Sequence, residues 1–90
     1  MTICFAYRIE GLVQNVFYRV TARREAERLG LTGFVRNESD GSVYAVVCGN
    51  PEALTEFEAW LWKGPERAIV SNVFKTPIKS EPFKGFEVQE

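Results

Sequence analysis

The residues best suited to chemistry lie in one short stretch, residues 11–19, which reads Gly-Leu-Val-Gln-Asn-Val-Phe-Tyr-Arg. This stretch joins an apolar run to a helical pattern, so we expect a loop whose backbone N–H groups stay unpaired at a helix N-terminus and favour an anion. Arg19 adds a planar cation to the first helical turn, where the helix dipole does not stabilise it. The stretch therefore predicts a cradle for a phosphoryl group, although by itself it also fits an ordinary strand-to-helix turn with a surface arginine.

The remaining residue types limit the chemistry that this cradle can support. The sequence contains no histidine, and its only cysteines are Cys4 and Cys48. A zinc site or a nucleophilic triad that needs histidine is therefore excluded. Arginine, backbone N–H groups, amides and carboxylates remain, and these favour positioning and electrostatic stabilisation over proton transfer.

The elements that position the cradle follow from periodicity. Alternating apolar residues predict a strand over residues 3–9 with its odd positions in the core, and a helical period predicts a helix over residues 18–29, ended by Gly30. Residues 33–38 and 42–48 have strand character and flank a turn at Gly41, so they form a hairpin. Asn50 and Pro51 are the cap and first residue of a second helix, residues 51–62.

The end of the chain completes the topology. Residues 68–74 predict a fourth strand, and residues 75–84, with Pro77 and Pro82, predict a loop. Residues 86–88 predict a short last strand or a strand extension. The β-α-β-β-α-β order predicts an α+β fold, an antiparallel sheet with both helices on one face. Its first two strands run parallel with the third between them, so the cradle and Asn37 lie at the same edge of the sheet.

Size and charge set the broad class. Ninety residues fit one domain over residues 1–90, and a net charge of −1 argues against nucleic acid as a partner. There is no long apolar run and no basic-then-apolar N-terminal segment. We therefore expect a soluble, cytoplasmic monomer that binds no membrane.

Trp60 and Trp62 cannot share one core stripe, so one of them should lie at the rim.

Residues 11–19 resemble the acylphosphatase signature Gly-x-Val-Gln-Gly-Val-x-Phe-Arg. The resemblance continues over nearly the whole chain, through Ala26-x-x-Leu29-Gly30-Leu31-x-Gly33-Phe34-Val35-Arg36-Asn37, Asp40-Gly41-x-Val43, Gly49, Trp60-Leu61, Gly64-Pro65, Ala68, Val70 and Phe86-x-Val88. It implies a ferredoxin-like α/β sandwich.

The same resemblance implies an enzyme that hydrolyses the carboxyl-phosphate bond of small-molecule acyl phosphates with neither a metal nor another cofactor. It makes Arg19 the phosphate-binding catalytic residue and Asn37 the residue that orients the attacking water. The backbone cradle would then comprise Gln14, Asn15, Val16, Phe17, Tyr18 and Arg19. Without the resemblance, Asn37 also fits ordinary turn chemistry beside a hairpin.

Two loop residues depart from the family pattern. Asn15 stands where the family has glycine, and Leu12 stands where a basic residue is frequent. If residue 15 needs a positive φ, asparagine is the best substitute for glycine, at a cost of about 1 kcal/mol. We expect activity, weakened by these two changes. Tyr18 and Phe34 replace phenylalanine and tryptophan and should matter less.

Cys4 and Cys48 should face each other across neighbouring antiparallel strands, on the side of the sheet away from the helices. They can form a disulfide under oxidation, provided that their Cα atoms lie within about 7 Å. In a reducing cytoplasm we expect two free thiols.

Two other functions remain compatible with this fold. One is a module that binds phosphate or an acyl phosphate without turnover. The other is an RNA-binding domain of similar topology, which would stack bases on exposed strand aromatics. We expect Phe5 and Tyr7 to lie beneath the helices and only Tyr44 to face outward, which counts against RNA.

Overall fold

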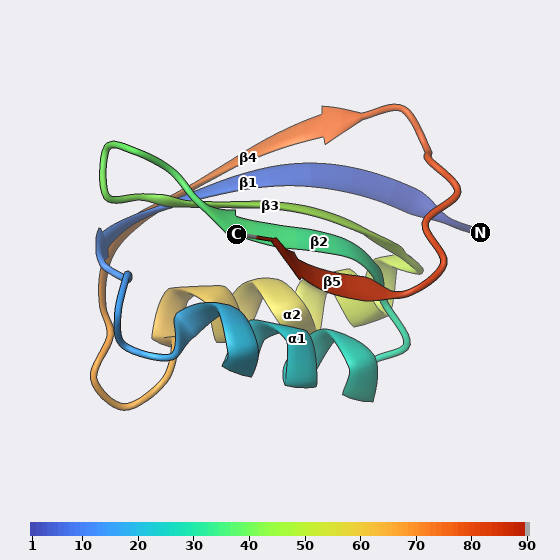
Figure 1. The fold of residues 1–90 in the computed structure, drawn as a ribbon. Helices are drawn as coiled ribbons and strands as arrows, with labels where there is room; N and C mark the ends of the chain where they lie inside the picture. Colours follow the sequence, from blue (N-terminus) through green and yellow to red (C-terminus); the bar gives the residue numbers. More distant parts are fainter. Residues whose placement is uncertain (90) are drawn as a thin grey trace.

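The computed structural model describes residues 1–89, which form five strands and two helices. In chain order they are β1 (Ile3–Leu12), α1 (Tyr18–Arg28), β2 (Thr32–Asn37), β3 (Val43–Gly49), α2 (Pro51–Lys63), β4 (Ile69–Ile78) and β5 (Phe86–Gln89). The strand order across the sheet is β4-β1-β3-β2-β5, and both helices cover one face (Figure 1). This is the ferredoxin-like α/β sandwich that the family resemblance implies.

The sheet is mixed rather than wholly antiparallel. β1 pairs antiparallel with β3 and β4, and β2 pairs antiparallel with β3, as predicted. β5 lies parallel to β2, because the chain leaves β4 at one edge and returns beside the start of β2 at the other. There the Gly33 N–H donates to the Gly85 carbonyl at 2.8 Å.

The core lies between the sheet and the helices, and the alternation predicted for β1 is confirmed. Tyr7 and Ile9 are fully buried and pack with α1 and α2 residues such as Ala22, Phe57 and Leu61. Trp62 is 52% exposed whereas Trp60 packs against the core, so one tryptophan does lie at the rim.

No helix within residues 1–89 is long and apolar enough to cross a membrane.

The helix ends follow the predicted signals. Gly30 has a φ of 73° after α1, with its N–H bonded to the Glu27 carbonyl and that of Leu31 to the Ala26 carbonyl. The Asn50 side chain accepts the Ala53 N–H at 2.8 Å and caps α2. These caps fix where each helix begins or ends, and therefore which loop residues remain available beside the sheet.

β4 is longer than the sequence predicts. The prediction ended the strand at Phe74 and placed residues 75–84 in a loop, but β4 continues to Ile78 with Pro77 opposite Phe5. β4 is an edge strand, so a proline that lacks an N–H donor is tolerated where its nitrogen faces away from the sheet.

Cys4 and Cys48 form a disulfide, so the expectation of two free thiols is wrong. The antiparallel register places the two residues directly opposite each other on β1 and β3, with a Cα–Cα distance of 4.1 Å. Both side chains are buried on the face away from the helices. The strand register alone thus brings the sulfurs within bonding distance.

The uncovered face also carries more aromatic surface than predicted. Tyr7 is buried beneath the helices as expected, but Tyr44 is accompanied by Phe34, at a ring distance of 6.3 Å, and by Phe74, which is 48% exposed. The prediction that only Tyr44 faces outward is therefore wrong. The Arg36 guanidinium lies 4.8 Å from the centre of the Tyr44 ring and covers part of this surface.

Candidate active site

The candidate site begins where β1 changes register. The pairing of β1 with β4 shifts between Glu10 and Gly11, and Gly11 has a φ of 128°. A Cβ at residue 11 would lie 2.1 Å from the Ile69 carbonyl oxygen. Only glycine fits at this point, so the bulge directs the chain out of the sheet and into the loop that precedes α1.

The loop itself holds two residues in the left-handed region. Asn15 has a φ of 62° and Phe17 a φ of 64°, whereas Val16 between them does not have a positive φ. Alternating φ signs turn successive N–H groups toward one concave side, which is an anion-binding arrangement. Within residues 1–89, none of the backbone N–H groups of residues 15–20 donates to a backbone carbonyl. These N–H groups are free to bind an anion.

Two side chains fix the ends of this loop. The Gln14 amide donates to the carbonyls of Glu38 (2.8 Å) and Ser42 (2.9 Å), which ties the loop to the β2–β3 hairpin. At the other end, Tyr18 is buried and its hydroxyl donates to the Leu61 carbonyl at 2.6 Å. Burial raises the pKa of Tyr18, so it remains a neutral donor. The loop is therefore held open by contacts outside itself.

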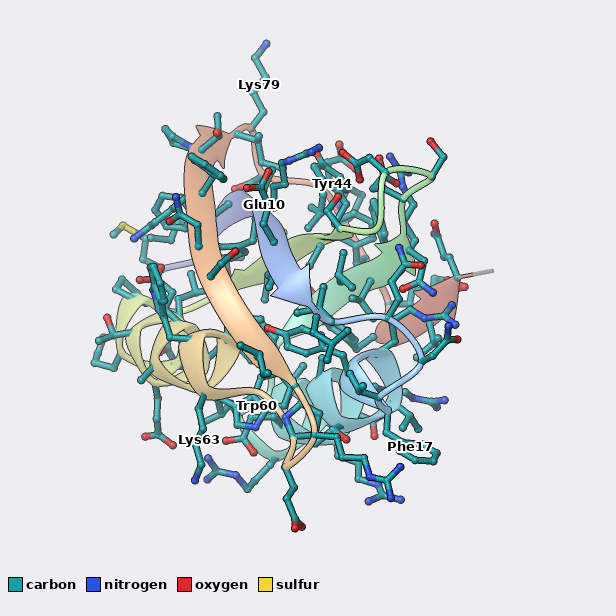
Figure 2. The ribbon with its side chains drawn as sticks, turned by 90° about the vertical axis from the view of Figure 1, so that its left-hand side faces the viewer. Glu10, Phe17, Tyr44, Trp60, Lys63 and Lys79 are labelled. Atoms are coloured by element: carbon teal, nitrogen blue, oxygen red, sulfur yellow. A yellow bond between two sulfur atoms is a disulfide. The ribbon has the colours of Figure 1, made fainter. Side chains whose placement is uncertain are left out.

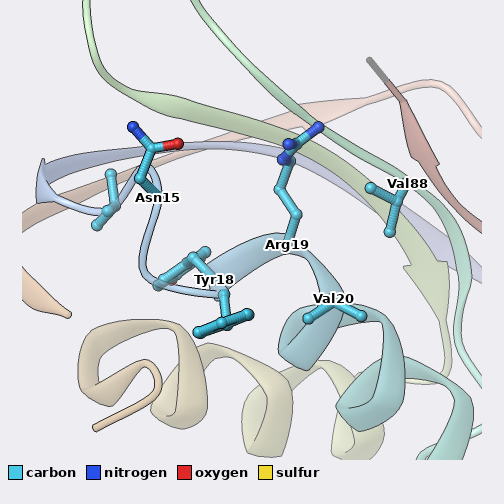
Figure 3. Close-up of a pocket in the computed structure, with 7 residues that line it drawn as sticks. Asn15, Tyr18, Arg19, Val20 and Val88 are labelled. Atoms are coloured by element: carbon cyan, nitrogen blue, oxygen red, sulfur yellow. The ribbon is translucent and has the colours of Figure 1, made fainter. Parts of the chain in front are cut away.

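Arg19 points from the start of α1 toward the end of the sheet. Its Nη1 donates to the Gln89 carbonyl at 2.6 Å, which orients the guanidinium and leaves further N–H donors. A pocket of about 350 Å³ lies beside it, lined by Val13, Asn15, Phe17, Tyr18, Arg19, Val20 and Val88. Figure 3 shows Asn15 on one side of Arg19, and Val20 and Val88 on the other.

Asn37 lies at the end of β2, directly before the residue that binds Gln14. Val35, two residues earlier on the same face of the strand, is fully buried, so Asn37 faces the helix side of the sheet. Its Oδ1 is buried and has no hydrogen-bond partner among residues 1–89. An unpaired buried acceptor calls for an explanation, and a hydrogen bond donated by a bound water molecule would satisfy it.

The structure divides the predicted site residues into groups. Four of them line the pocket, namely Asn15, Phe17, Tyr18 and Arg19. Gln14 and Val16 instead hold the loop in place, Gln14 by hydrogen bonds and Val16 by packing in the core. Asn37 is part of the β2–β3 hairpin that the loop contacts and does not line the pocket.

Three apolar lining residues were not predicted, namely Val13, Val20 and Val88. The sequence did hold a signal for Val20, because it is an apolar residue directly after Arg19 on a helix face that should be solvated and polar. Val13 and Val88 lie within the residues of the family resemblance, but nothing in their type indicates a pocket.

Among residues 1–89, Arg19 is the one charged residue that lines the pocket. No cluster of three or more histidine, cysteine, aspartate or glutamate residues that could hold a metal ion occurs within residues 1–89. On the neighbouring hairpin turn, hydrogen bonds from Ser42 and then from Arg8 lower the pKa of Asp40 to about 2. The Asp40 carboxylate therefore stays ionised and is held at the hairpin turn by these hydrogen bonds.

The loop, the arginine and the topology define a small α+β protein in which unpaired backbone N–H groups and Arg19 lie beside a pocket at the edge of its sheet. Residues 5–88 match the family model of acylphosphatase. An acylphosphatase of Xanthomonas oryzae pv. oryzae is 46% identical over 78 residues, which are 87% of this chain and 89% of that protein. The chain therefore belongs to the acylphosphatase family.

Comparison with solved structures supports the same family. An acylphosphatase from Coxiella burnetii superposes with a TM-score of 0.95 at 41% identity, covering 98% of this chain and 93% of the other. The acylphosphatase from Bacillus subtilis gives a TM-score of 0.94 at 27% identity over the whole of both chains.

Proposed function

We propose that this chain hydrolyses the carboxyl-phosphate bond of acyl phosphates to a carboxylate and inorganic phosphate. The observation that carries the proposal is the row of free N–H groups at residues 15–20, turned to one side by the φ values of Asn15 and Phe17, with Arg19 beside it. These groups bind the phosphoryl oxygens, and the guanidinium binds two of them at once.

The chemistry needs little beyond positioning. Water attacks phosphorus, the bond from phosphorus to the acyl oxygen breaks, and the acyl carboxylate leaves with the bonding pair. A carboxylate leaves readily near neutral pH without a general acid, which suits a chain that contains no histidine. The proton of the attacking water passes to a phosphoryl oxygen. Arg19 and the N–H groups stabilise the charge that builds on those oxygens.

Asn37 orients the water in this proposal. Its buried, unpaired Oδ1 accepts a hydrogen bond from the nucleophile without adding negative charge near the phosphate. The hydrogen bonds of Gln14 to Glu38 and Ser42 support this role, because they hold the loop against the strand end that carries Asn37.

We further propose that residues 1–90 act as one domain, as a cytoplasmic monomer, without metal and without nucleic acid. The net charge of −1 supports the last point. Because disulfides are rare in a reducing cytoplasm, the Cys4–Cys48 bond makes the location the point to test. Thiol trapping in fractionated cells tests location and bond state together, and gel filtration tests the monomer.

The decisive experiment measures benzoyl phosphate hydrolysis in the presence of EDTA. We expect the wild type to be active, and Arg19→Ala and Asn37→Ala each to lose at least about a hundredfold in kcat/KM. Arg24→Ala, an exposed arginine on the same helix, is the matched control and should keep full activity.

Loss of activity with EDTA would refute the metal-independent mechanism. Binding of inorganic phosphate without turnover by the wild type would identify a non-catalytic phosphate-binding module. A salt-dependent shift of RNA in a binding assay would favour the RNA-binding alternative.

A further inference from the structure

The pocket beside Arg19 is larger than a phosphoryl group requires. At roughly 30 Å³ per water-sized group, a phosphoryl group with one attacking water fills about 150 Å³. The pocket holds about 350 Å³. More than half of it thus remains for the acyl part of the substrate, which the backbone cradle does not contact.

The remaining space is apolar. Val20 is an apolar residue on the solvent side of α1, where it is 42% exposed. It lines the pocket together with Val88 of β5 and Phe17. Val20 and Val88 lie on the side of Arg19 away from Asn15 (Figure 3). The pocket therefore has a polar side that suits phosphate and an apolar side that suits hydrocarbon.

Phe17 does not belong to the hydrophobic core, so core packing does not explain why a phenylalanine stands at this position. Its side chain is 73% exposed, and its backbone is in the left-handed region at a cost of about 1–3 kcal/mol. Figure 2 shows it projecting outward near the start of α1, on the other side of the molecule from Tyr44. The backbone conformation serves the N–H groups, but an exposed aromatic ring that lines a pocket and has no core contact points to a ligand contact.

The charges select among acyl groups. Arg19 is the one charged side chain that lines the pocket within residues 1–89, and the phosphoryl group already occupies it. A second carboxylate on the acyl chain would lose water without gaining a partner. We propose that Phe17, Val20 and Val88 form an acyl subsite that selects acyl phosphates with an uncharged aryl or alkyl group over those of dicarboxylic acids. This inference rests on the proposed function.

A second hollow offers a competing place for the acyl group. It lies on another side of Phe17, has a volume of about 610 Å³, and is lined also by Val16, Pro65, Glu66 and Arg67. An acyl group bound there would contact the α2–β4 connection and would depend on Arg67 if it were anionic. The experiment must therefore separate Val20 from Arg67.

The test compares kcat/KM for benzoyl, acetyl and succinyl phosphate. In the wild type we expect the order benzoyl above acetyl above succinyl. In Phe17→Ala the benzoyl-to-acetyl ratio should fall fivefold to tenfold, as expected for roughly 50 Å² of lost apolar contact. Val20→Thr, which keeps the side-chain shape, should lower the same ratio about twofold to threefold.

Two matched variants serve as controls. Phe74→Ala removes an exposed phenylalanine from the opposite face of the sheet and should leave the ratio at the wild-type value. Arg67→Gln should leave the succinyl-to-acetyl ratio unchanged, since succinyl is the one anionic acyl group of the three. An unchanged benzoyl-to-acetyl ratio in Val20→Thr and Phe17→Ala, or a changed succinyl-to-acetyl ratio in Arg67→Gln, overturns the subsite. A wild type that hydrolyses none of the three substrates instead refutes the proposed function.

Discussion

Reduction of the Cys4–Cys48 disulfide should destabilise this protein strongly. The bond closes a loop between residues 44 positions apart. In the chain-entropy description, a cross-link over that length removes freedom from the unfolded chain worth about 4 kcal/mol at 25 °C. Native stabilities of small domains are roughly 5–15 kcal/mol, so the bond supplies a large share. The melting temperature of the reduced protein should be lower by about 15–30 °C.

The assay is urea unfolding of the wild type with and without dithiothreitol, followed by tryptophan fluorescence. Comparing one sequence in two redox states avoids the cavity that a Cys→Ala change would leave. We also expect a larger m-value after reduction, because the reduced unfolded chain exposes more surface. The double variant Cys4→Ala with Cys48→Ala controls for dithiothreitol itself and should not respond to it.

Two results would refute this reasoning. One is a pair of titratable thiols in the denatured, unreduced protein, which would mean that the bond does not form. The other is an oxidised and a reduced protein with the same urea midpoint, which would mean that the cross-link does not restrict the unfolded chain.

Three further predictions concern the hairpin and the loop. Folding lowers the pKa of Asp40 to about 2. The stability that this carboxylate contributes should be present above its ordinary pKa of 3.8 and lost as the pH falls toward 2. Asp40→Asn should therefore flatten the dependence of the melting temperature on pH over this range. Gln14→Leu leaves two hairpin carbonyls without their donor and should lower the free energy of unfolding by about 1–3 kcal/mol, measured in urea, and also lower kcat/KM. Asn15→Gly should relax the residue with a φ of 62° and raise or preserve benzoyl phosphate hydrolysis; a large loss would show that the Asn15 side chain itself acts on the substrate.

The sequence predicts the order of elements well, because each local signal agrees with the tertiary contact that it serves. The alternation in β1 buries Tyr7 and Ile9, and the caps at Gly30 and Asn50 lie where helices end and begin. The positive φ of Asn15 was also foreseeable, since asparagine replaces a family glycine there.

Other features depend on contacts that no local pattern encodes. Pro77 is part of β4 only because β4 is an edge strand, and β5 is parallel to β2 only because of where the chain returns. The strained φ of Phe17 has no sequence signal, since phenylalanine is a poor residue for that conformation. The Cys4–Cys48 pairing was predicted from register, but the redox state was not.

The strained backbone of the loop is maintained by the contacts on either side of it. Asn15 and Phe17 each hold a conformation that the free chain would leave, and an unanchored loop would close its N–H groups onto other partners. Gln14 before them bonds the hairpin, and Tyr18 after them bonds α2, so both ends of the strained segment are fixed by residues distant in sequence. The N–H groups are therefore oriented before an anion arrives, and the free energy of ordering them comes from folding rather than from substrate binding. In the proposed mechanism, which relies on position and charge alone, such preorganisation replaces the proton-transfer groups that the sequence lacks.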